Sequence, residues 1–206
     1  KLTLHDTITM LPDLKRREEY KRLQEVDSTA IQQALRNLDD AFKRFFKKQN
    51  HYPKFHSKKN YTQKYRTPFF VNQNGYKSID VIGNYVKLQK LGLVKTKLHR
   101  EFAEDGKILN ATVTRHASSK YFVSLCVKET VEMQTNLGGR IGLDVGLKVY
   151  LTDDLGNSIE NPRWFKSMQK KLAREQRRLS RKMPKSNRRE KQRVKTARVH
   201  AKIINK

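Results

Sequence analysis

The chain has 206 residues, and its 46 Lys and Arg against 20 Asp and Glu give a formal net charge of +26. This excess predicts a polyanionic partner, with nucleic acid favoured over an anionic membrane, and argues against an ordinary enzyme of neutral metabolites. No stretch approaches the roughly 18 apolar residues of a membrane span. The single cysteine, Cys126, lies in a strand-like run, so we expect a buried structural thiol, no internal disulfide and a cytoplasmic setting.

Residues 1–52 are predicted to be helical. Asp27 and Ser28 provide an N-cap signal, and apolar residues then recur at three- and four-residue spacing from Ala30 to Phe46. This pattern predicts an amphipathic helix whose apolar stripe packs against other elements. A shorter helix is expected over residues 14–24.

The next segment, residues 51–65, is basic, aromatic and irregular. It is either a surface that pairs with phosphates and stacks on bases, or a solvated linker whose aromatic rings pack locally. The candidate phosphate contacts in and beside it are Lys54, Lys58, Lys59, Lys64 and Arg66. The candidate base-stacking residues are Tyr52, Phe55, Tyr61 and Tyr65.

Residues 67–131 show a β pattern. Short alternating apolar runs are separated by turn residues at 72–75, 83–84 and 105–106. Five to seven short strands at this spacing predict a small antiparallel barrel or sandwich.

The run from Arg140 to Leu151 alternates strictly between apolar and other residues, which predicts one half-buried strand. Asp144 lies on its polar face between Gly142 and Gly146, and these glycines leave room for a bulky group to reach the carboxylate. In so basic a chain this pattern indicates a metal-binding carboxylate that acts on a phosphodiester, with a solvated Asp as the alternative. A turn at residues 152–157 and a short returning strand are predicted next, as at the beginning of a ribonuclease-H-like sheet.

Residues 163–206 are predicted to form a helical hairpin that is interrupted at residues 184–187. One apolar stripe comprises Trp164, Phe165, Met168, Leu172 and Leu179, and the other comprises Val194, Ala197, Ala201 and Ile204. The segment has 18 Lys and Arg against Glu175 and Glu190, a net charge of +16 (18 minus 2). Such a charge density is either a solvated face or, as we expect, a surface that a polyanion neutralises. The candidate nucleic-acid contacts here are Lys170, Lys171, Arg174, Arg177, Arg178, Arg181, Lys182, Arg188, Arg189 and Arg193.

Several segments together resemble TnpB proteins, the OrfB-type, transposon-encoded, RNA-guided nucleases related to type V CRISPR effectors. Residues 142–147, Gly-Leu-Asp-Val-Gly-Leu, resemble the first RuvC motif of that family. In chain order, residues 34–46 resemble its recognition helix, residues 53–59 the segment after it, residues 106–125 its wedge strands, and residues 159–162 and 172–182 the entry to its helical insertion.

The resemblance implies an α+β fold with a helical recognition-like segment at 1–52, a wedge-like β-barrel at 53–138 and a partial RuvC nuclease domain at 139–206. It implies that Asp144 holds Mg²⁺ together with a Glu and an Asp that this chain lacks. The implied partners are a guide RNA and target DNA, without a membrane. The zinc ribbon of the family is not present in this sequence.

Because members of that family continue past the position that matches Lys206, we expect this chain to be a fragment that does not cleave DNA alone. Two alternatives stay open. One is a catalytically inactive RNA- and DNA-binding relic or regulator of the same family. The other is an RNA binder of the ribosomal-protein kind, which would explain the charge but not the glycine-flanked Asp144.

Overall fold

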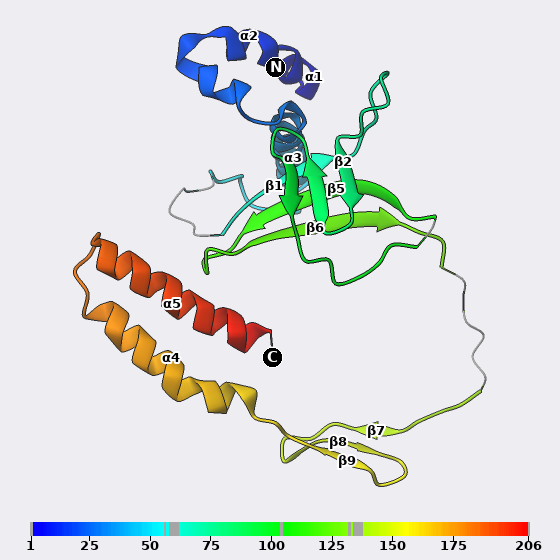
Figure 1. Cartoon of the computed structure of the whole chain (residues 1–206), viewed down its shortest axis with the longest axis vertical. Helices are drawn as coiled ribbons and strands as arrows, with labels where there is room; N and C mark the ends of the chain where they lie inside the picture. Colours follow the sequence, from blue (N-terminus) through cyan, green and yellow to red (C-terminus); the bar gives the residue numbers. More distant parts are fainter. Residues whose placement is uncertain are drawn as a thin grey trace. The chain divides into compact units, whose positions relative to one another are not determined.

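The computed structural model describes residues 2–55, 57, 62–103, 105–131, 133 and 138–205 (Figure 1). The chain divides into two compact units: unit 1 comprises residues 1–116 and 121–130, and unit 2 comprises residues 117–120 and 131–206. The described part contains five α-helices, one 3₁₀ helix and three antiparallel sheets of three strands each. The predicted mixture of helices and antiparallel strands is confirmed. The described strands close no barrel, and the three domain bounds and the RuvC assignment remain predictions.

Unit 1 begins with three short helical segments, α1 (Leu4–Thr9), α2 (Leu11–Arg16) and the 3₁₀ helix η1 (Glu18–Gln24). The Thr3 hydroxyl and the Asp6 carboxylate form a reciprocal cap at the beginning of α1. The prediction of one helix over residues 14–24 was wrong. Arg17 has an extended backbone (φ −70°, ψ 135°) and separates α2 from η1.

The long helix α3 (Ser28–Phe46) begins where the sequence predicted, with Asp27 as its N-cap. The Asp27 carboxylate is buried and accepts hydrogen bonds from the Thr29 backbone N–H (2.9 Å) and from the Thr67 hydroxyl (2.7 Å). Thr67 belongs to strand β1 (Gln63–Pro68). The N-cap residue Asp27 therefore also links α3 to strand β1. Both oxygens of its buried carboxylate accept hydrogen bonds, as a buried charge requires.

Two sheets complete unit 1. Strand β1 pairs with β5 (Lys107–Arg115), which pairs with β6 (Tyr121–Lys128). The second sheet contains β2 (Ile79–Ile82), β3 (Tyr85–Leu88) and β4 (Gly92–Lys95). Gly83 adopts a positive φ of 54° in the predicted β2–β3 turn, which favours glycine. The buried core comprises Ile79, Val86, Leu88 and Ala111.

Cys126 is exposed on β6, so the prediction of a buried structural thiol was wrong. Val123 and Leu125 of the same strand pack against the core. Because side chains alternate between the two faces of a strand, Cys126 lies on the opposite face.

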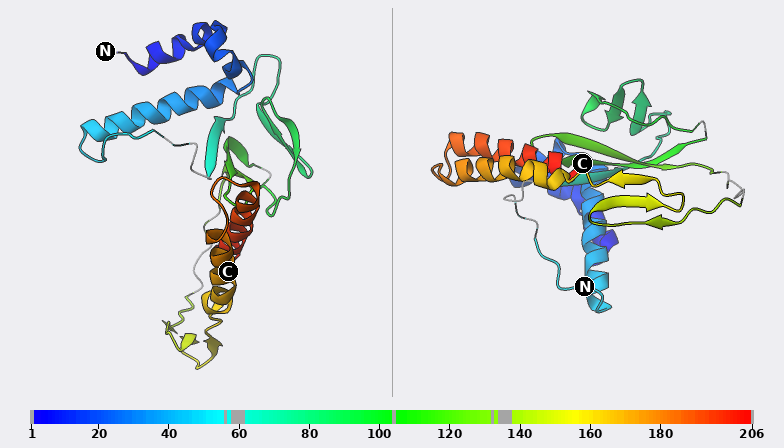
Figure 2. Two further views of the ribbon diagram at one scale, coloured as in Figure 1. Left: turned by 90° about the vertical axis from the view of Figure 1, so that its left-hand side faces the viewer. Right: turned by 90° about the horizontal axis from the view of Figure 1, so that it is seen from below.

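Unit 2 contains a small sheet and a helical hairpin. The sheet is formed by β7 (Leu143–Asp144), β8 (Val149–Asp153) and β9 (Ser158–Glu160), and the hairpin by α4 (Trp164–Ser180) and α5 (Asn187–Ile204), which Figure 2 shows packed side by side. None of the described helices combines the length and apolar composition that a membrane span requires.

The prediction of one strand over residues 140–151 was wrong, because the chain reverses between β7 and β8, which pair antiparallel. The Gly146 N–H donates to the Tyr150 carbonyl (3.3 Å), and a Cβ at position 146 would approach the Val149 carbonyl oxygen to 2.9 Å. Glycine therefore permits this reversal. Leu143 and Leu147, expected on the buried face, are 55% and 92% exposed.

Candidate nucleic-acid interface and Asp144 site

Asp144 is the last residue of β7, and its side chain is exposed. It lies opposite Thr152 of β8, which in turn lies opposite Ser158 of β9. Residues directly opposite each other point to the same face of a sheet, so one carboxylate and two hydroxyl groups line this face. These three groups form a polar row across the sheet.

Of the neighbouring carboxylates, Asp154 lies beside Gly142 at the end of the same face, whereas Asp153 and Glu160 lie opposite apolar residues. Asp153 lies opposite Leu143 and Glu160 opposite Val149. Asp153 instead anchors the predicted 152–157 turn, because its carboxylate accepts hydrogen bonds from the Leu155 N–H (3.0 Å), the Asn157 N–H (2.7 Å) and the Asn157 amide (2.7 Å). The Asn157 amide lowers the pKa of the Asp153 carboxyl below its ordinary value. Asp153 thus has a structural role in the turn.

A divalent metal ion needs several oxygen ligands, and in enzymes Mg²⁺ takes them from carboxylates, water and substrate. Within the described residues, no group of three or more His, Cys, Asp and Glu side chains could hold a metal ion. The residues around Asp144 therefore do not by themselves form a Mg²⁺ site. Asp144 can act as one ligand only.

The helical hairpin buries a partly polar interface. On α4 the packed positions Met168, Leu172 and Leu179 agree with the predicted stripe, and Glu175 lies among them. On α5 the most buried residues are Gln192, Thr196 and Val199, which the predicted stripe did not include. Within that stripe Val194, Ala197 and Ala201 are half-buried, and the prediction was wrong for Ile204. Ile204 is 81% exposed.

Glu175 is the centre of this polar interface. Its carboxylate accepts hydrogen bonds from the Gln192 amide (2.6 Å) and the Arg178 guanidinium (3.1 Å), and the Thr196 hydroxyl donates to its backbone carbonyl (3.4 Å). The Gln192 amide holds the pKa of the Glu175 carboxyl below its ordinary value. Glu175, one of the two acidic residues of the hairpin, thus joins α4 to α5 through hydrogen bonds.

We expect the Glu175→Ala variant to be less stable than the wild-type chain at pH 7, because Gln192 and Arg178 lose a buried partner. The lowered pKa also predicts an acid sensitivity. The stabilisation by Glu175 is complete above its unfolded pKa of about 4.3 and is lost as pH falls through its lower folded pKa. Urea unfolding at pH 7 and pH 3 measures both effects. The matched control is Glu190→Ala, which removes a more exposed carboxylate from α5. Equal behaviour of the two variants would contradict this role for Glu175.

Four of the predicted basic contacts have partners inside the hairpin, and one of them, Arg174, is exposed but also lies 3.9 Å from the Glu175 carboxylate. Arg189 donates to the carbonyls of Leu179 (3.3 Å) and Lys182 (3.0 Å) and so caps the end of α4. Arg178 pairs with Glu175, and Arg193 pairs with Glu190 (2.9 Å) and donates to the Ala117 carbonyl (3.2 Å). These arginines stabilise unit 2, whatever else they contact.

Exposed cations form stripes on the surfaces of both helices. Lys170, Arg174, Arg177 and Arg181 are exposed and follow one another at spacings of four, three and four residues, which places them on one face of α4. Lys171 is exposed and Lys182 is half-buried. A second exposed stripe lies on α5, and of its members only Arg188 was among the predicted contacts. The same periodicity in the sequence indicates all of them: Arg188, Lys191, Lys195, Arg198 and Lys202.

The predicted contacts in unit 1 are only partly described, since Lys58, Lys59 and Tyr61 lie outside the described residues. Lys54 and Phe55 are exposed, and the Tyr52 ring makes edge contacts with Phe42 (5.6 Å between centroids) and Phe45 (5.4 Å).

The remaining candidates of unit 1 lie on β1. Lys64 and Arg66 are exposed opposite Thr114 and Thr112 on one face of the sheet. Partial burial raises the pKa of the Tyr65 hydroxyl. The roles of these residues in nucleic-acid binding stay predictions.

Comparison with known proteins relates the chain to a family of transposon proteins. Residues 124–206 match the OrfB_IS605 family, described as "Probable transposase". A protein of Streptomyces pristinaespiralis named "Putative RNA-guided DNA endonuclease" is 33% identical over 204 residues, which cover 95% of this chain and 47% of that protein. "Putative RNA-guided DNA endonuclease InsQ" of Escherichia coli (strain K12) is 32% identical over 196 residues, which cover 95% of this chain and 46% of that protein. The chain spans about half the length of these curated relatives. The predicted resemblance is thereby confirmed: over nearly its whole length, this chain is similar to two proteins named as putative RNA-guided DNA endonucleases, and its residues 124–206 match the OrfB_IS605 family.

Proposed function

We propose that this chain supplies nucleic-acid-binding surfaces and one metal-binding carboxylate, Asp144, to a transposon-encoded, RNA-guided, metal-dependent DNA endonuclease. The observation that carries the proposal is the similarity over 95% of the chain to two relatives with that name. A guide RNA and target DNA are the proposed partners, and the ligands that complete a Mg²⁺ site with Asp144 lie outside the described residues.

The electrostatics of the hairpin support the nucleic-acid part of the proposal. Exposed cations follow both helices, whereas Glu175 and Glu190 pair with arginines of the hairpin itself. Cations aligned along a helix can neutralise successive phosphates and release the counterions bound to them. The two helices thus offer a surface of one charge sign to a phosphate backbone.

The position of Asp144 supports the catalytic part. Its carboxylate is exposed on a sheet face that it shares with two hydroxyl groups. A metal ion held by carboxylates would activate water and stabilise the leaving oxygen in phosphodiester hydrolysis. Asp144 would contribute negative charge at a point that nucleic acid can reach.

The second candidate function is a binding-only relic or regulator. It is favoured by the finding that the described residues provide no complete metal site. Both candidates require RNA binding, and the RNA that the protein carries when purified from its own host tests this shared claim. We expect one discrete RNA species, because a guide is a defined molecule.

A further inference from the structure

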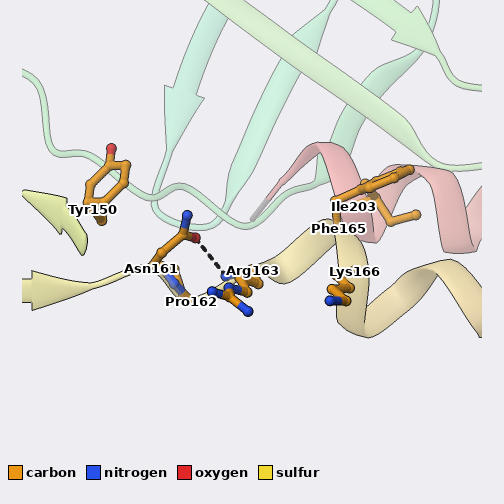
Figure 3. A pocket seen from close by; sticks show the side chains of 7 residues that line it. All are labelled: Tyr150, Asn161, Pro162, Arg163, Phe165, Lys166 and Ile203. Carbon is orange, nitrogen blue, oxygen red and sulfur yellow. Dashed lines mark hydrogen bonds between the residues drawn. The ribbon is translucent and has the colours of Figure 1, made fainter. Parts of the chain in front are cut away.

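A cavity of about 450 Å³ lies in unit 2, where β9 leads into α4 (Figure 3). Its size is within the range of small-molecule sites, which begins at about 300 Å³. The lining side chains include two aromatic residues, Tyr150 and Phe165, and two cationic residues, Arg163 and Lys166. The nucleic-acid contacts predicted from the sequence include none of these four.

The two aromatic residues flank the cavity. Figure 3 shows Tyr150 at one end and Phe165 beside Ile203 at the other. Tyr150 is 48% exposed and Phe165 is 58% exposed, so both rings present apolar surface to solvent. Exposed aromatic surface in a concave, basic site is the arrangement with which proteins stack unpaired bases.

Figure 3 shows Arg163 between Tyr150 and Phe165 and Lys166 at the Phe165 end, and no carboxylate is among the lining residues. Arg163 and Lys166 are both exposed. A ligand of complementary charge is anionic, and in a nucleotide the anionic group is the phosphate. The cavity therefore offers apolar stacking surface and phosphate-binding groups within the dimensions of one nucleotide.

The rim of the cavity is fixed by Asn161. Its amide donates to the Leu147 carbonyl (2.8 Å), and its side-chain oxygen accepts from the Arg163 N–H (3.0 Å). Arg163 has a left-handed backbone (φ 43°, ψ 42°), which is uncommon for a residue other than glycine. The hydrogen bond from Asn161 supports this conformation at the point where α4 begins.

We propose that this cavity binds one unpaired nucleotide of a nucleic-acid strand, with the base against Tyr150 or Phe165 and a phosphate beside Arg163 or Lys166. The inference rests on the proposed function and deepens it, since it assigns a nucleotide-sized site to the protein segment between the Asp144 sheet and the basic hairpin. The site does not distinguish RNA from DNA by this chemistry, because both nucleic acids have bases and phosphates.

Photocrosslinking of the full chain locates such a base. Single-stranded 12-mers that carry one 5-iodouracil are irradiated with the protein, as RNA and as DNA, and crosslinked peptides are identified by mass spectrometry. We expect crosslinks at Tyr150 or Phe165, and the strand that gives them identifies the nucleic acid. Equal crosslinking by free 5-iodouridine monophosphate at the same concentration would overturn the assignment to a strand.

Affinity measurements on variants provide the second readout. The leucine variant of the ring that crosslinks, Tyr150→Leu or Phe165→Leu, should weaken binding of the crosslinking strand by about 5- to 150-fold, the loss of one base–aromatic stack. Tyr150→Phe retains the ring and should bind like the wild type. Tyr85→Leu, at an exposed aromatic residue of β3, is the matched control. Circular dichroism confirms that each variant folds.

The outcomes separate this inference from the proposed function. Crosslinks confined to other residues, with affinity unchanged in both leucine variants, would overturn the nucleotide site and leave the proposed function intact. A chain that binds neither RNA nor DNA would overturn both.

Discussion

Replacing Asp144 with alanine is expected to abolish metal-dependent DNA cleavage by any form of this protein that cleaves DNA. Metal ions contribute several kcal/mol of transition-state stabilisation in phosphoryl transfer, so loss of a ligand should lower the rate by about 10³-fold or more. RNA binding should change by less than about twofold, because an exposed substitution usually costs under about 0.5 kcal/mol. Cleavage rates and RNA affinities measured on the same preparations test both statements.

The matched control for this prediction is Asp154→Ala. Asp154 is an exposed carboxylate in the turn after β8, and its side chain lies beside Gly142, two residues from Asp144. Both variants remove one negative charge from the same face of the small sheet, but only Asp144 lies directly opposite Thr152 in the polar row. An equal loss of cleavage in the two variants would indicate a general effect on the sheet and contradict a specific role for Asp144.

Neutralising the exposed α4 stripe is expected to have the largest effect on binding. In the variant that carries Lys170→Gln, Arg174→Gln, Arg177→Gln and Arg181→Gln, four candidate phosphate contacts are lost. Each contact to single-stranded nucleic acid contributes about 0.7 to the slope of log affinity against log salt, so the slope should fall by about 3. At 0.1 M salt this corresponds to an affinity loss of about 10² to 10³-fold. Fluorescence anisotropy with a labelled RNA at several salt concentrations measures both quantities.

Arg178 and Arg189 are kept in this variant because they hold Glu175 and the end of α4. The matched control replaces four exposed cations of unit 1, Lys90, Lys95, Lys97 and Arg100, with glutamine. It changes the net charge by the same amount. If both variants lost the same affinity, binding would depend on total charge, and the stripe would have no special role.

The sequence predicted elements whose signals are local. Asp27 ahead of Ser28 marked the beginning of α3, and residues 184–187 marked the turn between α4 and α5. These predictions succeeded because capping and helix-breaking preferences act within a few residues. The position of Asp27 in the sequence could not reveal that Thr67, forty residues away, donates to the same carboxylate.

The predictions that were wrong rest on sequence patterns that are compatible with two different structures. Apolar alternation around Asp144 fits one long strand, but it also fits two short strands joined at Gly146, which is what the chain forms. On α5 the apolar periodicity did not indicate Gln192 and Thr196, because the interface they form is polar and provides hydrogen-bond donors to Glu175. Such an interface becomes visible only when the partner helix is in place.

The arrangement of the cations could be predicted only in part. The total charge was evident from composition, and the four- and three-residue spacing on α5 was present in the sequence. The sequence could not show which arginines are committed to internal partners, since Arg178, Arg189 and Arg193 have the same local context as their exposed neighbours. The structure separates them through their hydrogen bonds.

The RNA bound to the protein in its own host is the most direct test of the proposed function. The protein would be purified under conditions that preserve RNA, and the recovered RNA would be sequenced. We predict one discrete species, depleted in the four-glutamine α4 variant and retained in the control variant of unit 1. A mixture dominated by ribosomal RNA, or no RNA at all, would contradict a role in an RNA-guided endonuclease.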